Sequence, residues 1–257
     1  GTVAVEGAAS TALIGRQTHA ALTDTNIDQA VDGKALVTAS ATNDGSIYNN
    51  AIVVAGSGTA AAGVGAAVNH DSTDADAAVS GGILKVGNLD VVSASRDKIL
   101  NIGVGGAGSM YAGVAGSVGV NIIDGSSKAQ IMDGADITSA NNVVVNAQSD
   151  AAIDNLSGIL AGAVTGGSIV LSVSVNDIEE TTLAGVSGKD TKITAKGTTD
   201  EKVADKLASG LTGGYMNTSI SVVPASYMDR ADSEYRGIAV SSSNTDKIQV
   251  WALNAAV

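Results

Sequence analysis

The densest group of potential metal ligands is the acidic segment Asn-His-Asp-Ser-Thr-Asp-Ala-Asp at positions 69–76. Its carboxylates, Asp71, Asp74 and Asp76, offer clustered hard oxygens of the kind that Ca²⁺ prefers. The segment lacks the glycine and the distal glutamate of an EF-hand, and no Gly-Gly-x-Gly-x-Asp nonapeptide repeat occurs in the chain. We therefore expect a solvated acidic loop and no cofactor, and keep these three aspartates as the candidate for a Ca²⁺ site.

Paired carboxylates for acid–base catalysis could come from Asp229, Asp232 and Glu234, because β-helix enzymes place acidic groups on one face. Tyr227 and Tyr235 flank this segment, and exposed aromatic side chains are favoured anchors at binding surfaces. The chain has no Gly-x-Ser-x-Gly elbow, Walker A sequence or His-Glu-x-x-His motif. We interpret these five residues as a candidate binding surface and predict that the chain is not an enzyme.

Three asparagines occupy one position of a repeated pattern, where each follows an uncharged apolar segment: Asn69, Asn121 and Asn176. A side-chain amide at such a position can bond the local backbone in a turn, or the equivalent asparagine one repeat away in an asparagine ladder. We expect a structural role, with each asparagine in the turn that ends a strand.

The composition excludes several classes of protein. The chain has 257 residues, a net charge of -12 and only 14 Lys and Arg, which argues against binding to nucleic acid. It has no Cys, which excludes disulfides and thiolate metal sites. It also has 32 Gly and no Phe, yet 44% of its residues are hydrophobic, so disorder is not expected. These features indicate a fold whose interior accepts small side chains.

A repeat of about 53 residues organises the chain. A phrase ending in Ala occurs five times, with gaps of 55, 53, 48 and 57 residues between its alanines, which are Ala39, Ala94, Ala147, Ala195 and Ala252. One coil of a parallel β-solenoid takes roughly 20 to 25 residues, so we expect about two coils per repeat. The sequence predicts an all-β parallel β-helix, or β-solenoid, of about five repeats within one domain spanning residues 1–257. The approximate units are 1–50, 51–105, 106–158, 159–210 and 211–257.

Within each repeat the hydrophobic period is two. Leu171, Val173 and Val175 alternate with serines, which predicts half-buried strands with the aliphatic side chains on one face. Residues 200–211 have apolar positions spaced by four, which predicts one short helical insertion. The uncharged stretch 99–123 is long enough to span a bilayer, but it is rich in Gly, Ser and Asn, so we expect no membrane insertion.

The repeats resemble a known family in the stretch from Gly63 to Ser187. Alternating Gly, Val and Ser strands close in Val-Asn, a polar loop and an Ala-x-aliphatic strand follow, and a Val-x-Ala phrase completes the unit. This pattern is similar to the repeats of leukotoxin-type filamentous adhesins, which are type V secreted passengers of anaerobic Gram-negative bacteria. The resemblance implies a repetitive stalk on the bacterial cell surface, anchored to the outer membrane through other regions. It carries over no catalytic residue.

The sequence therefore predicts an extracellular adhesin or fibre-stalk segment, whose partner is a host-cell or matrix receptor or another bacterial surface. Open strand edges also predict end-to-end self-association. The chain does not begin with a secretion signal, so we expect it to be an internal piece of a longer protein. Two alternatives stay open: a carbohydrate-active β-helix enzyme acting on an acidic polysaccharide, and a membrane-active toxin segment.

Overall fold

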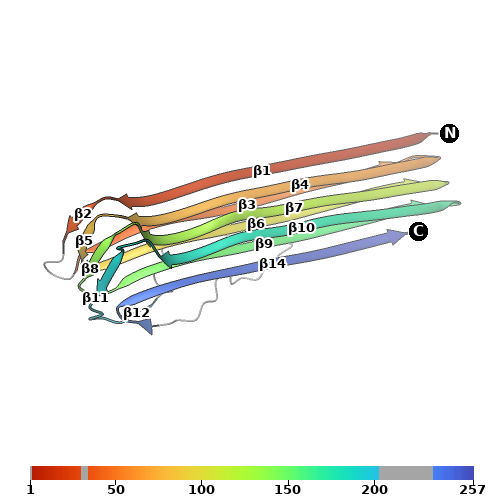
Figure 1. Cartoon of the computed structure of the whole chain (residues 1–257). Coiled ribbons are helices and arrows are strands. Elements are labelled where there is room, and N and C mark those ends of the chain that lie inside the picture. Colours follow the sequence, from red (N-terminus) through yellow and green to blue (C-terminus); the bar gives the residue numbers. More distant parts are fainter. Residues whose placement is uncertain (1, 30–33, 203–233) are drawn as a thin grey trace.

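The computed structural model describes residues 2–29, 34–202 and 234–257, and every regular element within them is a β-strand. Twelve of these strands form three parallel four-stranded sheets, which we call sheets A, B and C. Sheet A has the order β1-β4-β7-β10, sheet B has the order β11-β8-β5-β2, and sheet C has the order β14-β9-β6-β3. Figure 1 shows the long strands of sheets A and C running side by side, with the short strands of sheet B gathered at one end.

The strands of each sheet have similar lengths. Sheet A consists of β1 (Val3–Thr23), β4 (Ala60–Ser80), β7 (Ala112–Met132) and β10 (Gly167–Val186). Sheet B consists of β2 (Asn26–Asp28), β5 (Ile83–Val86), β8 (Asp136–Ser139) and β11 (Lys192–Ala195). Sheet C consists of β3 (Leu36–Gly56), β6 (Asn88–Ser109), β9 (Val143–Ala163) and β14 (Ile238–Ala256). A separate antiparallel pair joins β12 (Glu201–Lys202) to β13 (Glu234–Tyr235).

The chain passes through sheets A, B and C in turn and then begins again, and we call each such set of three strands a rung. Val3 pairs with Ala60, Ala60 with Ala112, and Ala112 with Gly167, which are steps of 57, 52 and 55 residues. One repeat therefore forms one rung, and the expectation of two coils per repeat was wrong. The reason is strand length: β1, β4 and β7 have 21 residues each, which is about 70 Å of extended chain.

The fourth rung differs from the first three. It combines β10 and β11 with β14, and residues 196–237 lie between β11 and β14. The last two copies of the Ala phrase therefore belong to one rung, because Ala195 ends β11 whereas Ala252 lies within β14. Most of the helix expected at residues 200–211 lies outside the described residues, and Glu201 and Lys202 form strand β12 instead.

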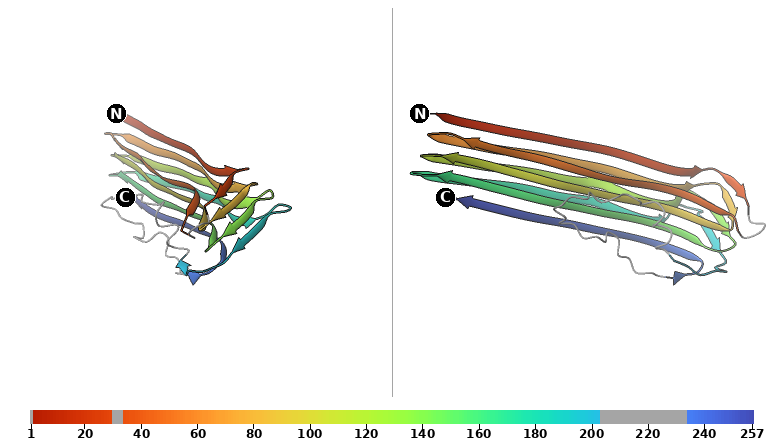
Figure 2. Two further views of the ribbon diagram at one scale, coloured as in Figure 1. Left: turned by 90° about the vertical axis from the view of Figure 1, so that its left-hand side faces the viewer. Right: turned by 180° about the vertical axis from the view of Figure 1, so that it is seen from behind.

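Sheets A and C face each other as a flat slab, and sheet B closes one end of it (Figure 2). The N- and C-termini lie at the other end (Figure 1). Leu84, Leu89, Val79, Ile131 and Ile137 are fully buried in the main hydrophobic cluster, which forms near sheet B where strands of all three sheets meet.

The aliphatic side chains in the half of sheet A away from sheet B point outward. Val173 and Val175 are 44% and 51% exposed, whereas Ser117 and Asn121 on the neighbouring strand are buried between the sheets. The aliphatic side chains do share one face of half-buried strands, as the alternation predicts, and in this half that face is the outer one. The cause is the close approach of the sheets: a Cβ added at Gly105 of sheet C would overlap the carbonyl oxygen of Gly116 in sheet A. Most side chains between the sheets in this half are therefore small, although Val53 and Ile159 are also buried there.

Candidate interaction surfaces and the buried polar layer

The three aligned asparagines form a ladder across sheet A. The amide nitrogen of Asn69 donates to the side-chain oxygen of Asn121 at 2.7 Å, and Asn121 donates in the same way to Asn176 at 2.7 Å. Asn49 of sheet C donates to Asn69 at 2.6 Å, so the ladder also links the two sheets. These asparagines lie in the middle of their strands rather than in turns, which corrects the expectation of a strand-ending position.

A second polar layer surrounds Arg16 on the inner face of β1. Its Nη2 donates to Asp71 Oδ1 at 3.0 Å, to Thr73 Oγ1 at 3.0 Å and to Asp97 Oδ1. Thr73 Oγ1 in turn donates to Asp97 Oδ1 at 3.0 Å. Asp71 and Asp97 have fully buried side chains, and Arg16 is 23% exposed. Gly45 faces this group from β3, and a Cβ there would overlap the guanidinium. Gly45 thus supplies the space that Arg16 occupies.

The acids of this layer hold their protons more tightly than they would in water. Burial, together with the charge of Asp97, raises the pKa of Asp71 to about 6 despite the opposing effect of Arg16. Burial also raises the pKa of Asp97. Glu180, in the same row of β10, has its pKa raised to about 7, mainly by burial, although a hydrogen bond from Ser149 opposes the shift. Arg16 contacts two of these three carboxyls, Asp71 and Asp97.

The three aspartates proposed for Ca²⁺ do not converge. Because β4 alternates its side chains, Asp71 points into the slab while Asp74 and Asp76 lie on the outer side. Asp71 binds Arg16, and Asp76 lies 3.2 Å from Nδ1 of His19. Among the described residues, no group of three or more His, Cys, Asp or Glu is placed to hold a metal ion. The expected loop is a strand, and this overturns the Ca²⁺ candidate.

The candidate binding surface around residues 227–235 falls largely outside the described part of the chain. Tyr227, Asp229 and Asp232 are among the residues that the structure leaves out. Glu234 and Tyr235 form β13, in which Tyr235 pairs with Glu201 and Glu234 with Lys202. The role of this candidate surface in binding stays a prediction.

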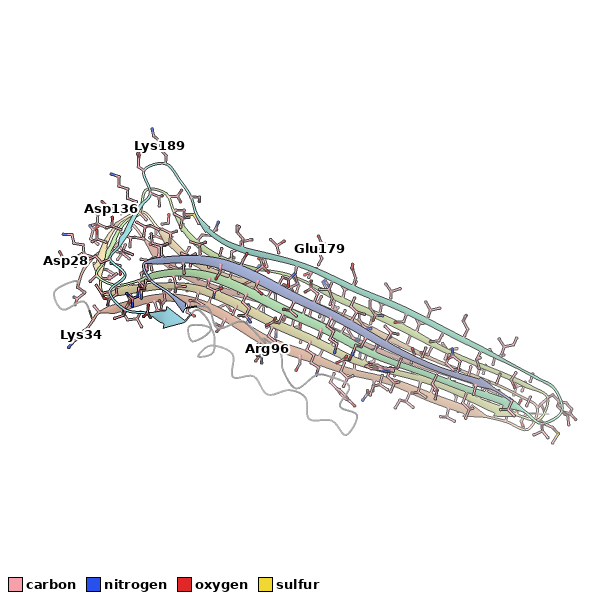
Figure 3. The ribbon with its side chains drawn as sticks, turned by 90° about the horizontal axis from the view of Figure 1, so that it is seen from below. Asp28, Lys34, Arg96, Asp136, Glu179 and Lys189 are labelled. Carbon is pink, nitrogen blue, oxygen red and sulfur yellow. The ribbon has the colours of Figure 1, made fainter. Side chains whose placement is uncertain are left out.

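Charged and apolar side chains separate along the slab. Residues 45–69, 99–123 and 155–176 contain no Asp, Glu, Lys or Arg, and they form the half away from sheet B. The labelled Asp28, Lys34, Asp136 and Lys189 gather around sheet B (Figure 3). We call the outward aliphatic side chains of sheet A in the uncharged half the apolar face. Its exposed members are Val64, Val68, Val114, Val118, Ile169, Leu171, Val173 and Val175.

Two shallow apolar grooves cross sheet C. One of about 500 Å³ is lined by side chains that include Val54, Val104 and Leu160, with Gly106 and Gly162 between them. The other, of about 450 Å³, is lined by Leu100, Leu156, Trp251 and Leu253, with the carboxylate of Asp154 at one side. Neither groove brings together a nucleophile and a base among the described lining residues, so both offer apolar contact rather than chemistry.

The Arg16 layer is the feature that sequence reasoning missed. Arg16 is the only Lys or Arg in the first 33 residues, and it lies on the inward side of a strand that alternates in period two. A lone cation in a strand whose only carboxylate is the distant Glu6 was the available signal. Its partners Asp71 and Asp97 were 55 and 81 residues away, so only the register of the rungs could pair them.

Comparison of the chain with protein-family models, with curated proteins and with solved structures gives no match. In the described part of the chain, no helix has the length and hydropathy needed to cross a membrane.

Proposed function

We propose that the chain is a segment of parallel β-solenoid that serves as a non-enzymatic stalk of a cell-surface adhesin. In this proposal each repeat of about 53 residues adds one coil, and the stack carries exposed side chains away from the bacterial surface. Its partner is a receptor on a host cell, in the extracellular matrix or on another bacterium.

The observation that carries the proposal is the repetition of side-chain rows in register. Ile47, Ile99, Ile153 and Ile248 are paired partners across the four strands of sheet C, as the asparagines are across sheet A. Matching rows allow each rung to act as the template for the next, because like side chains meet at every step. An array of this kind extends by repetition, which is what a stalk requires.

Adhesion can be measured directly with beads coated with the chain. If the proposal is right, coated beads attach to epithelial cells or matrix-coated wells more than albumin-coated beads do. Tyr235→Ala tests the candidate binding surface, and Tyr111→Ala, which alters an exposed tyrosine near the far end of the slab, serves as its control. Attachment no greater than with albumin would refute the adhesive role. Cleavage of an acidic polysaccharide that is lost in Asp229→Asn would instead establish the enzymatic alternative.

A second candidate, contact with a lipid surface, is favoured by the apolar face. Leu171 and Ile169 are 65% and 64% exposed. They lie in the half of the slab away from sheet B, where three of the four rungs carry no Asp, Glu, Lys or Arg. Dye-loaded vesicles of phosphatidylethanolamine and phosphatidylglycerol would leak if this face enters lipid, and Leu171→Asp should abolish the leakage. Asn50→Asp, at an exposed position of sheet C in the same half, is the matched control. Intact vesicles at saturating protein would exclude this candidate.

A further inference from the structure

The apolar groove beside Trp251 crosses three neighbouring strands of sheet C. Ile102 of β6 pairs with Leu156 of β9, which pairs with Trp251 of β14, so these side chains form one row across the sheet. Leu100 and Asp154 form the adjacent row, two residues earlier along β6 and β9. All of them line the groove, which has a volume of about 450 Å³. The register of the rungs therefore brings together residues from three repeats of the sequence.

The groove opens on the broad outer face of sheet C. Asn101 and Asn155 alternate with its lining residues along β6 and β9, and they point into the slab, because a Cβ added at Gly119 of sheet A would meet both. The side chains that flank these asparagines therefore point away from sheet A. Strands pair edge to edge, so any strand next to β14 would lie beside the groove and not over it.

The walls of the groove are apolar. Its described lining consists of leucine, isoleucine, valine and alanine residues together with Trp251, which is 36% exposed, and Asp154. Among these residues, Asp154 is the only one whose side chain carries a charge or accepts a hydrogen bond. Small-molecule sites have volumes of about 300–1,000 Å³ and combine an apolar lining with a few polar groups. This groove has the size and the composition of such a site.

The carboxyl of Asp154 has an oxygen without a partner. Asp154 is 1% exposed, and its Oδ2 has no hydrogen-bond partner in the described part of the chain. Burial raises the pKa of Asp154, whereas the charges of Lys98 and Lys247 lower it and favour the carboxylate. A carboxylate can only accept hydrogen bonds, and buried polar atoms are normally paired. The groove therefore offers an acceptor that a hydrogen-bond donor on a ligand would satisfy.

We propose that this groove binds a small apolar molecule that carries one neutral hydroxyl group. The hydroxyl donates to Oδ2 of Asp154, and the hydrocarbon body lies against Leu156 and Trp251. Burial of the hydrocarbon supplies most of the affinity, since each methylene removed from water strengthens binding about fourfold. The hydroxyl sets the specificity, because it satisfies the one buried acceptor.

The surroundings of Asp154 favour a neutral ligand with a single donor. A cationic ligand would meet the charges of Lys98 and Lys247, which already act on this carboxyl, and an anionic ligand would meet the carboxyl itself. A saccharide carries several hydroxyls, and the described lining provides one side-chain acceptor for them. Hydroxyls that lose water and find no partner weaken binding, so the groove discriminates against sugars.

The fluorescence of Trp251 measures occupancy of the groove, because it is the only tryptophan in the chain. Titration of the 257-residue chain with octanol should change its emission to saturation. Methyl heptyl ether, an isomer of octanol that lacks the hydroxyl donor, should bind about thirtyfold more weakly. Affinity should rise about fourfold for each methylene from butanol to octanol. Methyl glucoside should leave the emission unchanged.

Substitution of Asp154 tests the hydrogen bond. Asp154→Asn provides a neutral acceptor of the same shape and should lower the affinity for octanol about fivefold, without changing the affinity for the ether. Asp154→Val removes the acceptor and should make the two affinities equal. Asp44→Asn makes the first exchange on the outer face of β3, outside the described lining, and should bind octanol as wild type does. Circular dichroism checks that each variant retains its β-structure.

Three results would overturn the proposal: emission without a saturable change up to the solubility limit of octanol, equal affinities of the wild-type chain for octanol and the ether, or undiminished octanol binding by both Asp154 variants. The groove lies on sheet C, whereas the apolar face lies on sheet A, and neither adhesion nor contact with lipid enters the argument. The binding of alcohols and the proposed function can therefore fail independently.

Discussion

Substitution of Gly45 by alanine should expel Arg16 from the slab. The added methyl would overlap the guanidinium, and the flexible Arg16 side chain would yield before the backbone does. Asp71 and Asp97 would then lose the cation that both contact. Gly45 has no positive φ, so the methyl itself introduces no backbone strain.

The expected loss of stability follows from the burial of these groups. Removing one partner of a buried ion pair costs about 3–5 kcal/mol, and the lower end applies because Arg16 is 23% exposed. Replacing a glycine by alanine returns about 0.4–1 kcal/mol through the unfolded state. We therefore expect Gly45→Ala to destabilise the chain by about 2 kcal/mol.

Equilibrium urea unfolding followed by far-UV circular dichroism measures this change, and hydrogen exchange of the β1 amides reports it locally. Gly15→Ala is the control, since its Cβ would meet nothing within 4 Å. In an Arg16→Met background the overlap is relieved, so Gly45→Ala should be nearly neutral there. An equal loss in both backgrounds would refute the view that Gly45 exists to admit Arg16.

Asn121→Ala removes the central link of the asparagine ladder and leaves buried amides without partners, so urea unfolding should show a loss of about 2 kcal/mol. Gly105→Ala would press a methyl on a carbonyl oxygen of the facing sheet and should cost about 2–3 kcal/mol, whereas Gly167→Ala, with nothing within 4 Å, should be neutral by the same assay. Because the pKa values of Asp71 and Glu180 are raised from 3.8 and 4.5 to about 6 and about 7, the folded chain binds more protons than the unfolded chain between these values. The free energy of unfolding, measured by urea titration at each pH, should therefore fall as pH rises from about 4 to about 7, by up to about 3 kcal/mol per group, and Glu180→Gln should reduce the slope.

The repeat was visible in the sequence because the rungs reuse the same positions. Asn69, Asn121 and Asn176 align residue for residue in sheet A, as their spacing indicated. The size of a rung was not predictable from that spacing alone. A strand of 21 residues reads as several shorter strands when Asp-Gly pairs such as Asp124-Gly125 interrupt it, yet β7 continues through this pair without a turn.

The sequence did not show which face of these strands is buried, for a related reason. Alternation of Val with Ser or Gly predicts two faces but does not say which one is buried, and hydrophobicity favours the aliphatic one. In the uncharged half, the short distance between sheets A and C decides the matter, because it admits Ser117 and Asn121 but leaves Val118 outside. Because of the same alternation, Asp71 and Asp74 are close in sequence but lie on opposite faces of β4.

The breadth of a rung has a mechanical consequence for any filament built from it. A slab about 70 Å wide and about 20 Å thick resists bending within the plane of its sheets about twelvefold more than bending across them, because stiffness grows with the square of the depth at constant cross-section. Such a filament therefore bends easily in one direction and resists bending in the other. Under shear it would flex toward its two broad faces while its narrow edges stay straight.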